Sequence, residues 1–588
     1  MEVTRIFDIL PYYEFKFKPK EDVIASKENG TWIKYDIRKY REIVDNISYG
    51  FLALGVQPGD KIAQISFNRV EWNFVDMAML QIGAVHIPIY PTISESDYRY
   101  IFSHSDIKYL FISGNEILRK IHNIIQEIPG ILGVYAYKET EGALNFNDLV
   151  DLGKKNPAPE KLEAIKTSIK PDDVATIIYT SGTTGNPKGV MLSHNNIISN
   201  FKAVSYIPPY GEEAKAISYL PLCHVYERML NYLYQYLGIS VYYAESIGMI
   251  TENMKDVQPQ ILTTVPRLLE KIYDKLVAAG QKMKGPQSWI YWWALHLALR
   301  YELKGANGWL YEVKRKFYDK LVYVKWREAL GGKIDIIVSG GAALQQRLAR
   351  LYTCAGIHIL EGYGLTETSP VIAVSDLTEN GIKFGTVGPV LKGVSVKIAD
   401  DEEILVKGPN VMKGYYKATE LTAEVIDDEG WFHTGDMGQI EPEGQLKITG
   451  RKKELFKTSF GKYVHPQLIE DMFNESLFID QIIVVGESQK FAGALIVPDF
   501  AFLRSWCARK EIPYTTDPEM VKHPKVLKRF KHVMDRYNKR LGDTEKVKKW
   551  KLMDKEWTVD TGEITPTLKI KRNFIQKKYE KEINELFS

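Results

Sequence analysis

One short loop combines glycine, hydroxyl and lysine side chains in a pattern that suits phosphate. Residues 179–189 read Tyr-Thr-Ser-Gly-Thr-Thr-Gly-Asn-Pro-Lys-Gly, and the apolar run 174–179 before them predicts a buried strand. Glycines let backbone N–H groups approach phosphate oxygens, hydroxyls add donors, and a lysine adds charge. A Walker loop has its lysine directly after the last glycine, and this loop does not. We therefore expect a phosphate loop of another kind, formed by Thr180, Ser181, Gly182, Thr183, Thr184, Gly185 and Lys188.

Further segments of distinctive composition follow this loop in chain order. The first two come directly after apolar runs, at 334–338 and 357–360, that predict strands. Together with the loop, these segments resemble the AMP-forming adenylating enzymes, the superfamily of acyl-CoA synthetases, luciferases and peptide-synthetase adenylation domains. The resemblance covers about residues 30 to 580, and it rests on Ser339–Ala342, Glu361–Thr368, Trp431–Asp436, Gly450–Glu454 and Gly562–Arg572.

The resemblance implies a site for ATP and AMP. Tyr363 is suited to stack on adenine, Thr366 to hydrogen-bond the α-phosphate, and Glu367 to hold Mg²⁺ through oxygen. Asp436 would accept hydrogen bonds from both ribose hydroxyls, and Arg451 would support that contact. Glycines beside them allow close approach of a flat ligand. The remaining nucleotide contacts are expected from Gly340, Gly341, Ala342, Glu361, Gly362 and Gly364.

The family reaction has two halves, and the resemblance assigns residues to each. A carboxylate attacks the α-phosphate of Mg·ATP and gives an acyl-adenylate and pyrophosphate. Lys569 matches the family's mobile catalytic lysine, whose charge would stabilise that transition state. The C-terminal domain then rotates at a hinge, expected at Lys453, and CoA attacks the adenylate. The loop that would face CoA contains Phe460, Gly461 and Lys462, with one glycine where many relatives have two.

Three segments narrow the acid substrate. Residues 220–228, 263–271 and 565–569 resemble the long-chain fatty acyl-CoA synthetases, which implies a fatty acid as the third substrate beside ATP and CoA. His224 would lie by the acyl pocket; the alternative is a histidine that caps a helix or packs in the core. Arg228 falls near a position where some relatives carry an aromatic acyl gate, so no gating mechanism transfers.

Three other functions compete with this interpretation. An acyl-AMP ligase would pass its acyl group to a carrier protein, and a carrier domain after Ser588 would favour it. A ligase for aryl or other carboxylic acids, such as bile acids, would differ only in pocket width. A catalytically dead lipid-binding or scaffold member would be favoured by loss of Lys569 or Glu367, and both are present.

Composition excludes several classes of protein. The chain has 588 residues, with 45% hydrophobic and 26% charged, which is typical of globular proteins. A net charge of +3 argues against a nucleic-acid binder. Three widely spaced cysteines match no metal site and indicate a reducing compartment. The first eight residues do not resemble a signal peptide, and no run approaches the roughly 18 apolar residues of a spanning helix. We expect a cytoplasmic protein.

The order of apolar runs predicts an α/β fold. Strand and helix patterns alternate to about residue 370, which implies two largely parallel sheets covered by helices. Short alternating runs from about 385 to 450 predict a small antiparallel barrel-like region. A smaller α+β unit follows, with a lysine-rich helix from about Lys569. The domains are therefore expected at 1–453 and 454–588, the second being a mobile lid that carries Lys569.

An insertion relative to shorter-chain relatives is expected at 285–332. It holds five tryptophans among basic residues, a combination that suits the interface of a membrane from which a fatty acid is collected. The alternative is an extra packed helical hairpin. On the first interpretation, the protein lies peripherally on the cytoplasmic membrane face. The tryptophans are Trp289, Trp292, Trp293, Trp309 and Trp326.

Overall fold

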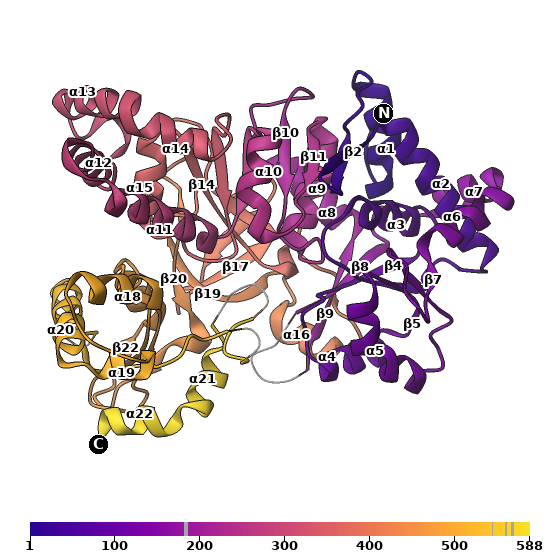
Figure 1. The fold of residues 1–588 in the computed structure, drawn as a ribbon. Coiled ribbons are helices and arrows are strands. Elements are labelled where there is room, and N and C mark those ends of the chain that lie inside the picture. The colour runs from indigo at the N-terminus through magenta and orange to yellow at the C-terminus, as the bar shows by residue number, and fades with distance from the viewer. Residues whose placement is uncertain (181–185, 544, 559–560, 566–569) are drawn as a thin grey trace.

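A computed structural model describes the chain except residues 181–185, 544, 559–560 and 566–569. It has a large N-terminal part with two eight-stranded sheets and a small C-terminal part beside it (Figure 1). The first sheet is parallel except at its edges, where β2 and β15 run antiparallel to their neighbours. In spatial order its strands are β15 (Val371–Val374), β14 (His358–Gly364), β13 (Ile336–Ser339), β12 (Ile261–Thr264), β10 (Lys215–Ser218), β11 (Ser240–Tyr243), β1 (Ile24–Glu28) and β2 (Thr31–Tyr35).

The second sheet is also mixed. Its centre is parallel, and the phosphate-loop strand β8 pairs antiparallel with β9 at one end. Buried β-branched and aromatic side chains on both faces explain why these short runs form strands. The expectation of two largely parallel, helix-covered sheets is confirmed. The order is β18 (Gly414–Tyr415), β9 (Lys188–Ser193), β8 (Val174–Thr180), β4 (Val85–Ile89), β3 (Lys61–Ile65), β5 (Ile107–Ile112), β6 (Gly133–Ala136) and β7 (Leu144–Asn145).

Helices fill the space between the sheets and cover their outer faces. The largest hydrophobic core takes residues from both sheets and from the helices between them. Those helices are α1 (Ile9–Lys16), α2 (Ile37–Ala53), α3 (Val70–Gln81), α6 (Phe146–Lys155), α7 (Pro159–Ser168), α8 (His194–Val204) and α9 (Val225–Leu237). The outer helices are α4 (Glu95–Ser105) and α5 (Asn115–Glu127) on the second sheet, and α10 (Ile250–Val257), α11 (Pro266–Lys282), α12 (Gly285–Ala298), α13 (Trp309–Tyr318), α14 (Val324–Ala329) and α15 (Gln346–Cys354) on the first.

A four-stranded antiparallel sheet forms the half-barrel expected at about 385–450. It consists of β16 (Ser395–Ile398), β17 (Glu403–Lys407), β19 (Phe432–Ile440) and β20 (Leu446–Arg451), and α16 (Thr419–Val425) lies beside it. The short turn η6 (Lys452–Glu454) then leads into the C-terminal part.

The C-terminal part has its own hydrophobic core, made of buried residues between 456 and 586. One bridge to the large part is the ion pair of Arg267 and Asp480, with 2.5 Å between Nη2 and Oδ1. Its elements are β21 (Phe456–Lys457), β22 (Tyr463–Val464), α17 (Pro466–Phe473), β23 (Ile479–Val485), β24 (Ala492–Pro498), α18 (Phe500–Arg509), α19 (Asp517–Lys522), α20 (Pro524–Asn538), β25 (Val547–Leu552), α21 (Arg572–Lys578) and α22 (Glu580–Phe587).

Two local expectations differ from the structure. Strand β14 continues to Gly364, so residues 361–364 are strand rather than the loop after a strand, because β15 supplies an antiparallel partner for them. The C-terminal helix begins at Arg572 rather than at about Lys569, and it is followed by the separate helix α22.

A fully buried ion pair joins the helices between the sheets. Arg228 of α9 donates to Asp76 of α3 at 2.6 Å and to the Thr176 hydroxyl of β8 at 2.7 Å. Tyr232 and His86 donate to the two oxygens of the same carboxylate. Burial, with the Arg228 charge, lowers the pKa of His86 to about 4, so this histidine is neutral. Asp76 and Arg228 are therefore the two charged groups of this cluster, and they neutralise each other.

We expect Asp76→Ala to destabilise the fold strongly, because it leaves the Arg228 guanidinium buried without its counter-ion. The loss in free energy of unfolding should be about 3–5 kcal/mol, measured by urea denaturation. The control is Glu585→Ala, which removes the exposed partner of Lys551 and should leave the free energy of unfolding nearly unchanged. Equal losses for the two variants would contradict the role given to the buried pair.

Candidate active site

The two ends of the phosphate loop lie side by side. Thr180 at the end of β8 is opposite Lys188 at the start of β9, so the loop closes a hairpin between two strands. Five loop residues predicted to bind phosphate, Ser181, Gly182, Thr183, Thr184 and Gly185, lie outside the described residues. The Lys188 ammonium lies 5.1 Å from the centre of the Tyr415 ring on β18. The positive charge of Lys188 therefore lies at the end of this hairpin, where the loop joins β9.

Glu367 lies next to that charge. Tyr415 connects the two, since its hydroxyl donates to Oε1 of Glu367 at 2.9 Å while its ring faces Lys188. Glu367 follows β14 in the short turn η5 (Thr366–Thr368), and its carbonyl accepts from the Met412 N–H. The structure therefore brings Lys188 together with the segment that holds Thr366 and Glu367, which lies far from it in sequence.

Asp436 is a buried carboxylate with two fixed donors. It pairs with Arg451 across β19 and β20, and Arg451 Nε lies 3.0 Å from Oδ1. The Tyr363 hydroxyl donates to Oδ2 at 2.8 Å. The Asp436 N–H donates to the Thr434 hydroxyl, which holds the turn in place. The predicted adenine and ribose residues thus meet in one cluster, and burial raises the pKa of Tyr363 well above its usual value.

Close approach requires glycine at one position of the predicted nucleotide segments and leaves little room for a side chain at another. A Cβ on Gly364 would lie 1.8 Å from the Pro370 carbonyl oxygen, and one on Gly340 would lie 3.2 Å from the Tyr226 ring. Gly341, between Gly340 and Ala342, has a φ of +81°, which favours glycine. Glu361 and Gly362 lie on β14, where Glu361 is opposite Ser339 of β13.

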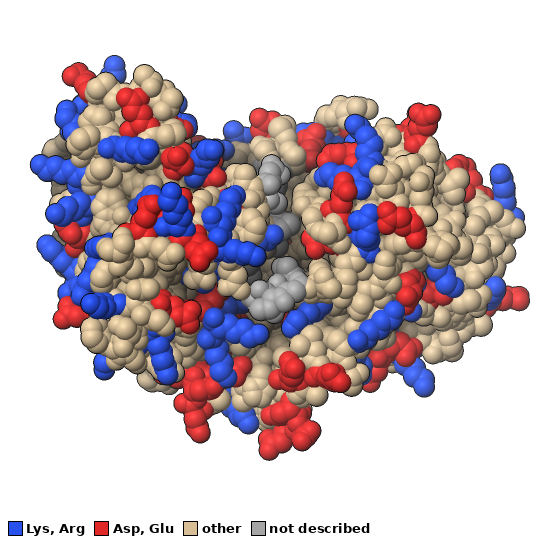
Figure 2. Space-filling model, turned by 90° about the horizontal axis from the view of Figure 1, so that it is seen from below, with Lys and Arg blue, Asp and Glu red and all other residues tan. Residues whose placement is uncertain are grey.

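Seen from below, the surface is hollowed between its two halves (Figure 2).

His224 caps a helix. Its Nδ1 accepts the Tyr226 N–H at 3.2 Å at the start of α9, so this nitrogen carries no proton. The cap was the alternative role expected for this residue. Gly238, with φ of +77°, ends the same helix.

Sequence reasoning missed the buried acid that follows this cap. Glu227 accepts hydrogen bonds from the Ser218 hydroxyl and the Asn231 amide, and its Oε2 has no partner among the described residues. Burial raises its pKa to about 8. Arg228 was placed near an acyl gate, yet it is fully buried against Asp76. Neither role has a local sequence signal, because the partners come from other elements.

The predicted hinge and CoA-side loop are exposed. Lys453 lies in η6, and its neighbour Lys452 pairs with Asp401 at 2.6 Å and Glu403 at 2.9 Å. Phe460, Gly461 and Lys462 form the turn between β21 and β22, closed by the Thr458 N–H donating to the Lys462 carbonyl at 2.9 Å. Lys569 lies outside the described residues.

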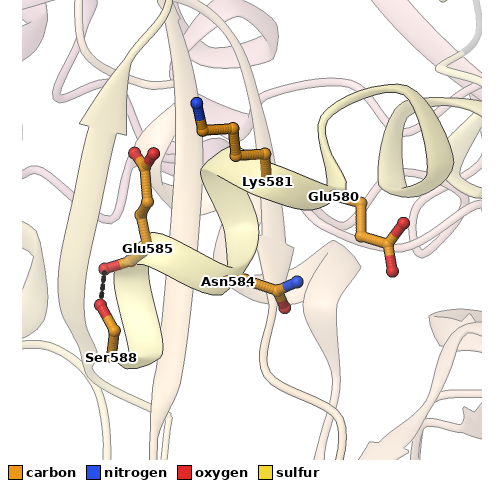
Figure 3. Close-up of a pocket in the computed structure, with 5 residues that line it drawn as sticks. All are labelled: Glu580, Lys581, Asn584, Glu585 and Ser588. Atoms are coloured by element: carbon orange, nitrogen blue, oxygen red, sulfur yellow. Dashed lines mark hydrogen bonds between the residues drawn. The ribbon is translucent and has the colours of Figure 1, made fainter.

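A hollow elsewhere on the surface lacks the features of a site. It measures about 480 Å³ and lies along α22, with lining residues from that one stretch of chain (Figure 3). Its lining residues are Glu580, Lys581, Asn584, Glu585 and Ser588, and none of the predicted site residues is among them. Among the described residues, no group of three or more His, Cys, Asp or Glu side chains is arranged to hold a metal ion. None of the described helices is long and apolar enough to cross a membrane.

Family models match both parts of the chain. Residues 16–416 match the AMP-binding enzymes, and residues 454–588 match the AMP-binding enzyme C-terminal domain. The chain therefore belongs to the AMP-binding enzyme family.

Curated relatives place it within that family among the long-chain fatty acid–CoA ligases. A long-chain-fatty-acid–CoA ligase of Mycobacterium bovis, FadD15, is 33% identical over 95% of this chain and 93% of its own. Long-chain-fatty-acid–CoA ligase 1 of Cavia porcellus is 32% identical over 95% of this chain and 82% of its own. The fold matches the adenylation domain of a carboxylate reductase from Mycobacterium chelonae, with a TM-score of 0.75 at 18% identity over 99% of this chain and 91% of that one.

The raised pKa of Glu227 predicts a pH-dependent stability. The folded state holds the proton up to about pH 8, whereas the unfolded carboxyl releases it near pH 4.5. The stability contribution is full below pH 4.5 and is lost as the pH rises to about 8, with a slope of up to about 1.4 kcal/mol per pH unit. Glu227→Gln removes this titration, so its stability relative to wild type should increase with pH.

Urea denaturation of both proteins across this pH range measures the difference. The control is Glu163→Gln, on an exposed glutamate of α7, which should keep the wild-type profile. Parallel profiles for wild type and Glu227→Gln would show that Glu227 ionises normally in the folded protein.

Proposed function

We propose that this protein is a long-chain fatty acid–CoA ligase that makes acyl-CoA through an acyl-adenylate. The supporting observation is the convergence of Lys188, Glu367, Tyr363, Asp436 and Arg451 from segments far apart in sequence. A cation, a carboxylate beside it, and a tyrosine–carboxylate–arginine cluster suit triphosphate, metal and ribose respectively. Relatives over nearly the whole chain are named as long-chain fatty acid–CoA ligases.

In the first half-reaction, a fatty carboxylate oxygen forms a bond to the α-phosphorus of ATP and pyrophosphate leaves. Lys188 and the loop from Thr180 to Gly185 bind the phosphates, Thr366 positions the α-phosphate, and Lys569 stabilises the transition-state charge. Asp436, already oriented by Tyr363 and Arg451, accepts the ribose hydroxyls. Fixed donors and acceptors of this kind need no rearrangement when the nucleotide binds.

Glu367 is the residue proposed to hold the Mg²⁺ that accompanies ATP. It presents carboxylate oxygens, which Mg²⁺ prefers, and one oxygen is already oriented by Tyr415. One carboxylate suffices because Mg²⁺ bound with ATP takes its other ligands from phosphates and water. When bound, the ion neutralises phosphate charge. Tyr415 orients Glu367 through the hydrogen bond from its hydroxyl, and its ring faces the Lys188 ammonium.

In the second half-reaction, the CoA sulfur forms a bond to the adenylate carbonyl, AMP leaves with the bonding electrons, and the thiol proton is lost. The proposal sets the domain boundary between residues 453 and 454, with Lys453 as the hinge and the lid carrying Lys569. Phe460, Gly461 and Lys462 face CoA when the lid has rotated. The separate core of the C-terminal part supports rotation as a unit.

The proposal also places the enzyme in the cytoplasm, at the periphery of a membrane. Long-chain fatty acids partition into lipid, so an enzyme that collects them gains from contact with a bilayer. The segment 285–332 is the proposed contact. Trp292 is half-buried and Trp326 is 5% exposed, so only part of the predicted tryptophan set is available for this role.

AMP release from purified protein and Mg·ATP tests the proposed reaction. The acids run from acetate to oleate, with benzoate as the aryl control, each with and without CoA. We expect CoA-dependent AMP release that is greatest for acids from dodecanoate to oleate. Pyrophosphate exchange without CoA turnover would instead indicate a carrier-loading ligase, and a preference for benzoate would indicate an aryl-acid ligase.

Lys569→Ala should separate the two half-reactions. Loss of its charge removes stabilisation of the first transition state, so the adenylation rate should fall about 10²–10³-fold. Thiolation of supplied acyl-AMP should keep most of its rate, because the lysine has no part in that step. Single-turnover assays measure each half, with Lys571→Ala as the neighbouring control. Equal losses in both halves would remove Lys569 from its assigned role.

A further inference from the structure

Exposed apolar side chains are concentrated on two helices of the large part. Nine of the 22 large hydrophobic side chains found exposed among the described residues lie between Met283 and Leu321, a small fraction of the chain. The most exposed belong to α12 and α13, which lie at one corner of the molecule on the opposite side from α22 (Figure 1). We define the α12–α13 face as Trp289, Trp293, Trp309, Leu310, Val313 and Phe317.

The spacing shows that each helix presents one apolar side to solvent. On α12, Trp289 and Trp293 are one turn apart, with ring centres 6.1 Å apart, and they are 72% and 57% exposed. On α13, Trp309, Val313 and Phe317 follow at intervals of four residues and are 73%, 57% and 57% exposed. A group of exposed apolar side chains on neighbouring helices normally marks an interaction site.

The helices that carry this face are fixed from behind. Ala294, Leu295 and Ala298 of α12 are buried in the core that covers the first sheet. The Tyr311 hydroxyl of α13 donates to the Leu297 carbonyl at 2.7 Å, which ties the two helices together. The face is therefore preformed, and binding does not have to order it.

The charges around the face are positive. Three acidic residues of this segment are engaged, because Glu312 pairs with Arg315, Asp319 with Arg327 and Glu302 with Arg350, while a fourth, Glu328, is exposed. Exposed lysines have no such partners among the described residues, so the rim attracts anions. These lysines are Lys282, Lys284, Lys314, Lys316, Lys320 and Lys325.

This combination fits a lipid surface better than a protein. Tryptophan prefers the interface between headgroups and hydrocarbon, and unpaired lysines match anionic headgroups. Protein interfaces are depleted in lysine, and a second copy would bring two positive rims together.

We propose that the α12–α13 face docks on a lipid bilayer that contains anionic lipid, with Trp289, Trp293 and Trp309 inserted at the headgroup level. This assigns the membrane contact already proposed for segment 285–332 to one face, and its purpose, collection of a fatty acid, rests on the proposed function. The bound helices lie on the membrane and do not cross it.

Co-sedimentation with vesicles tests the proposal. Wild-type protein is mixed with vesicles of phosphatidylcholine alone or with added phosphatidylglycerol, at low and high salt. We expect stronger binding to the anionic vesicles, weakened by salt. Replacing Trp289, Trp293 and Trp309 together by Ala should lower the partition coefficient about tenfold or more on both vesicles. Replacing Lys314, Lys316 and Lys320 by Ala should reduce the preference for anionic lipid and the salt effect, because three of the six rim lysines are removed.

The matched control replaces Phe15, Leu132 and Tyr206, exposed apolar residues elsewhere, by Ala and should bind as wild type does. Absence of wild-type binding, or equal binding by the tryptophan variant, overturns the proposal. The proposal is also overturned if wild-type protein binds no vesicles and instead forms a dimer that the tryptophan variant does not form. AMP release with dodecanoate added free of vesicles separates the two proposals: its absence in wild type removes the ligase function, while the vesicle result stands independently.

Discussion

The buried pair of Asp76 and Arg228 is the interaction on which the arrangement of the large part depends. Asp76 lies on α3 and Arg228 on α9, and their hydrogen-bonding neighbours Tyr232, His86 and Thr176 come from α9, β4 and β8, so one charge pair fixes two helices against the second sheet. A buried charge without its partner is costly, and this makes alternative positions of α9 unfavourable. Because β8 leads to the phosphate loop and His224 caps the start of α9, the pair also links these two parts of the candidate site.

The same pairing bears on the buried acid Glu227 of α9. Glu227 adjoins Arg228 in sequence, but the arginine is engaged by Asp76, and Glu227 receives only neutral donors. Desolvation therefore dominates, and its pKa rises to about 8. Two adjacent residues of one helix thus differ: Arg228 is buried with a counter-ion, whereas Glu227 is buried without one. The difference is set by which neighbour faces each side chain.

Much of this organisation was predictable from the sequence, for local reasons. The apolar runs at 174–179 and 334–338 became β8 and β13 because their burial is encoded by residue type. The order of motifs identified the family. The partners of Arg228 and Glu227 were not predictable, since Asp76 is 152 residues away from Arg228. Likewise, Trp289 and Trp326 look alike in sequence, and only packing against Tyr291 and Tyr323 distinguishes the buried one.

The candidate nucleotide site and the proposed hinge share the same short hairpin. Asp436 pairs with Arg451, and the next residue, Lys452, pairs with Glu403. Glu403 also accepts the Gly435 N–H, directly before Asp436. A ribose at Asp436 would therefore act on the residues that fix the chain where it enters the C-terminal part. Because these contacts connect β17, β19, β20 and η6, we expect nucleotide binding at Asp436 to affect the position of the C-terminal part, and by linkage the reverse.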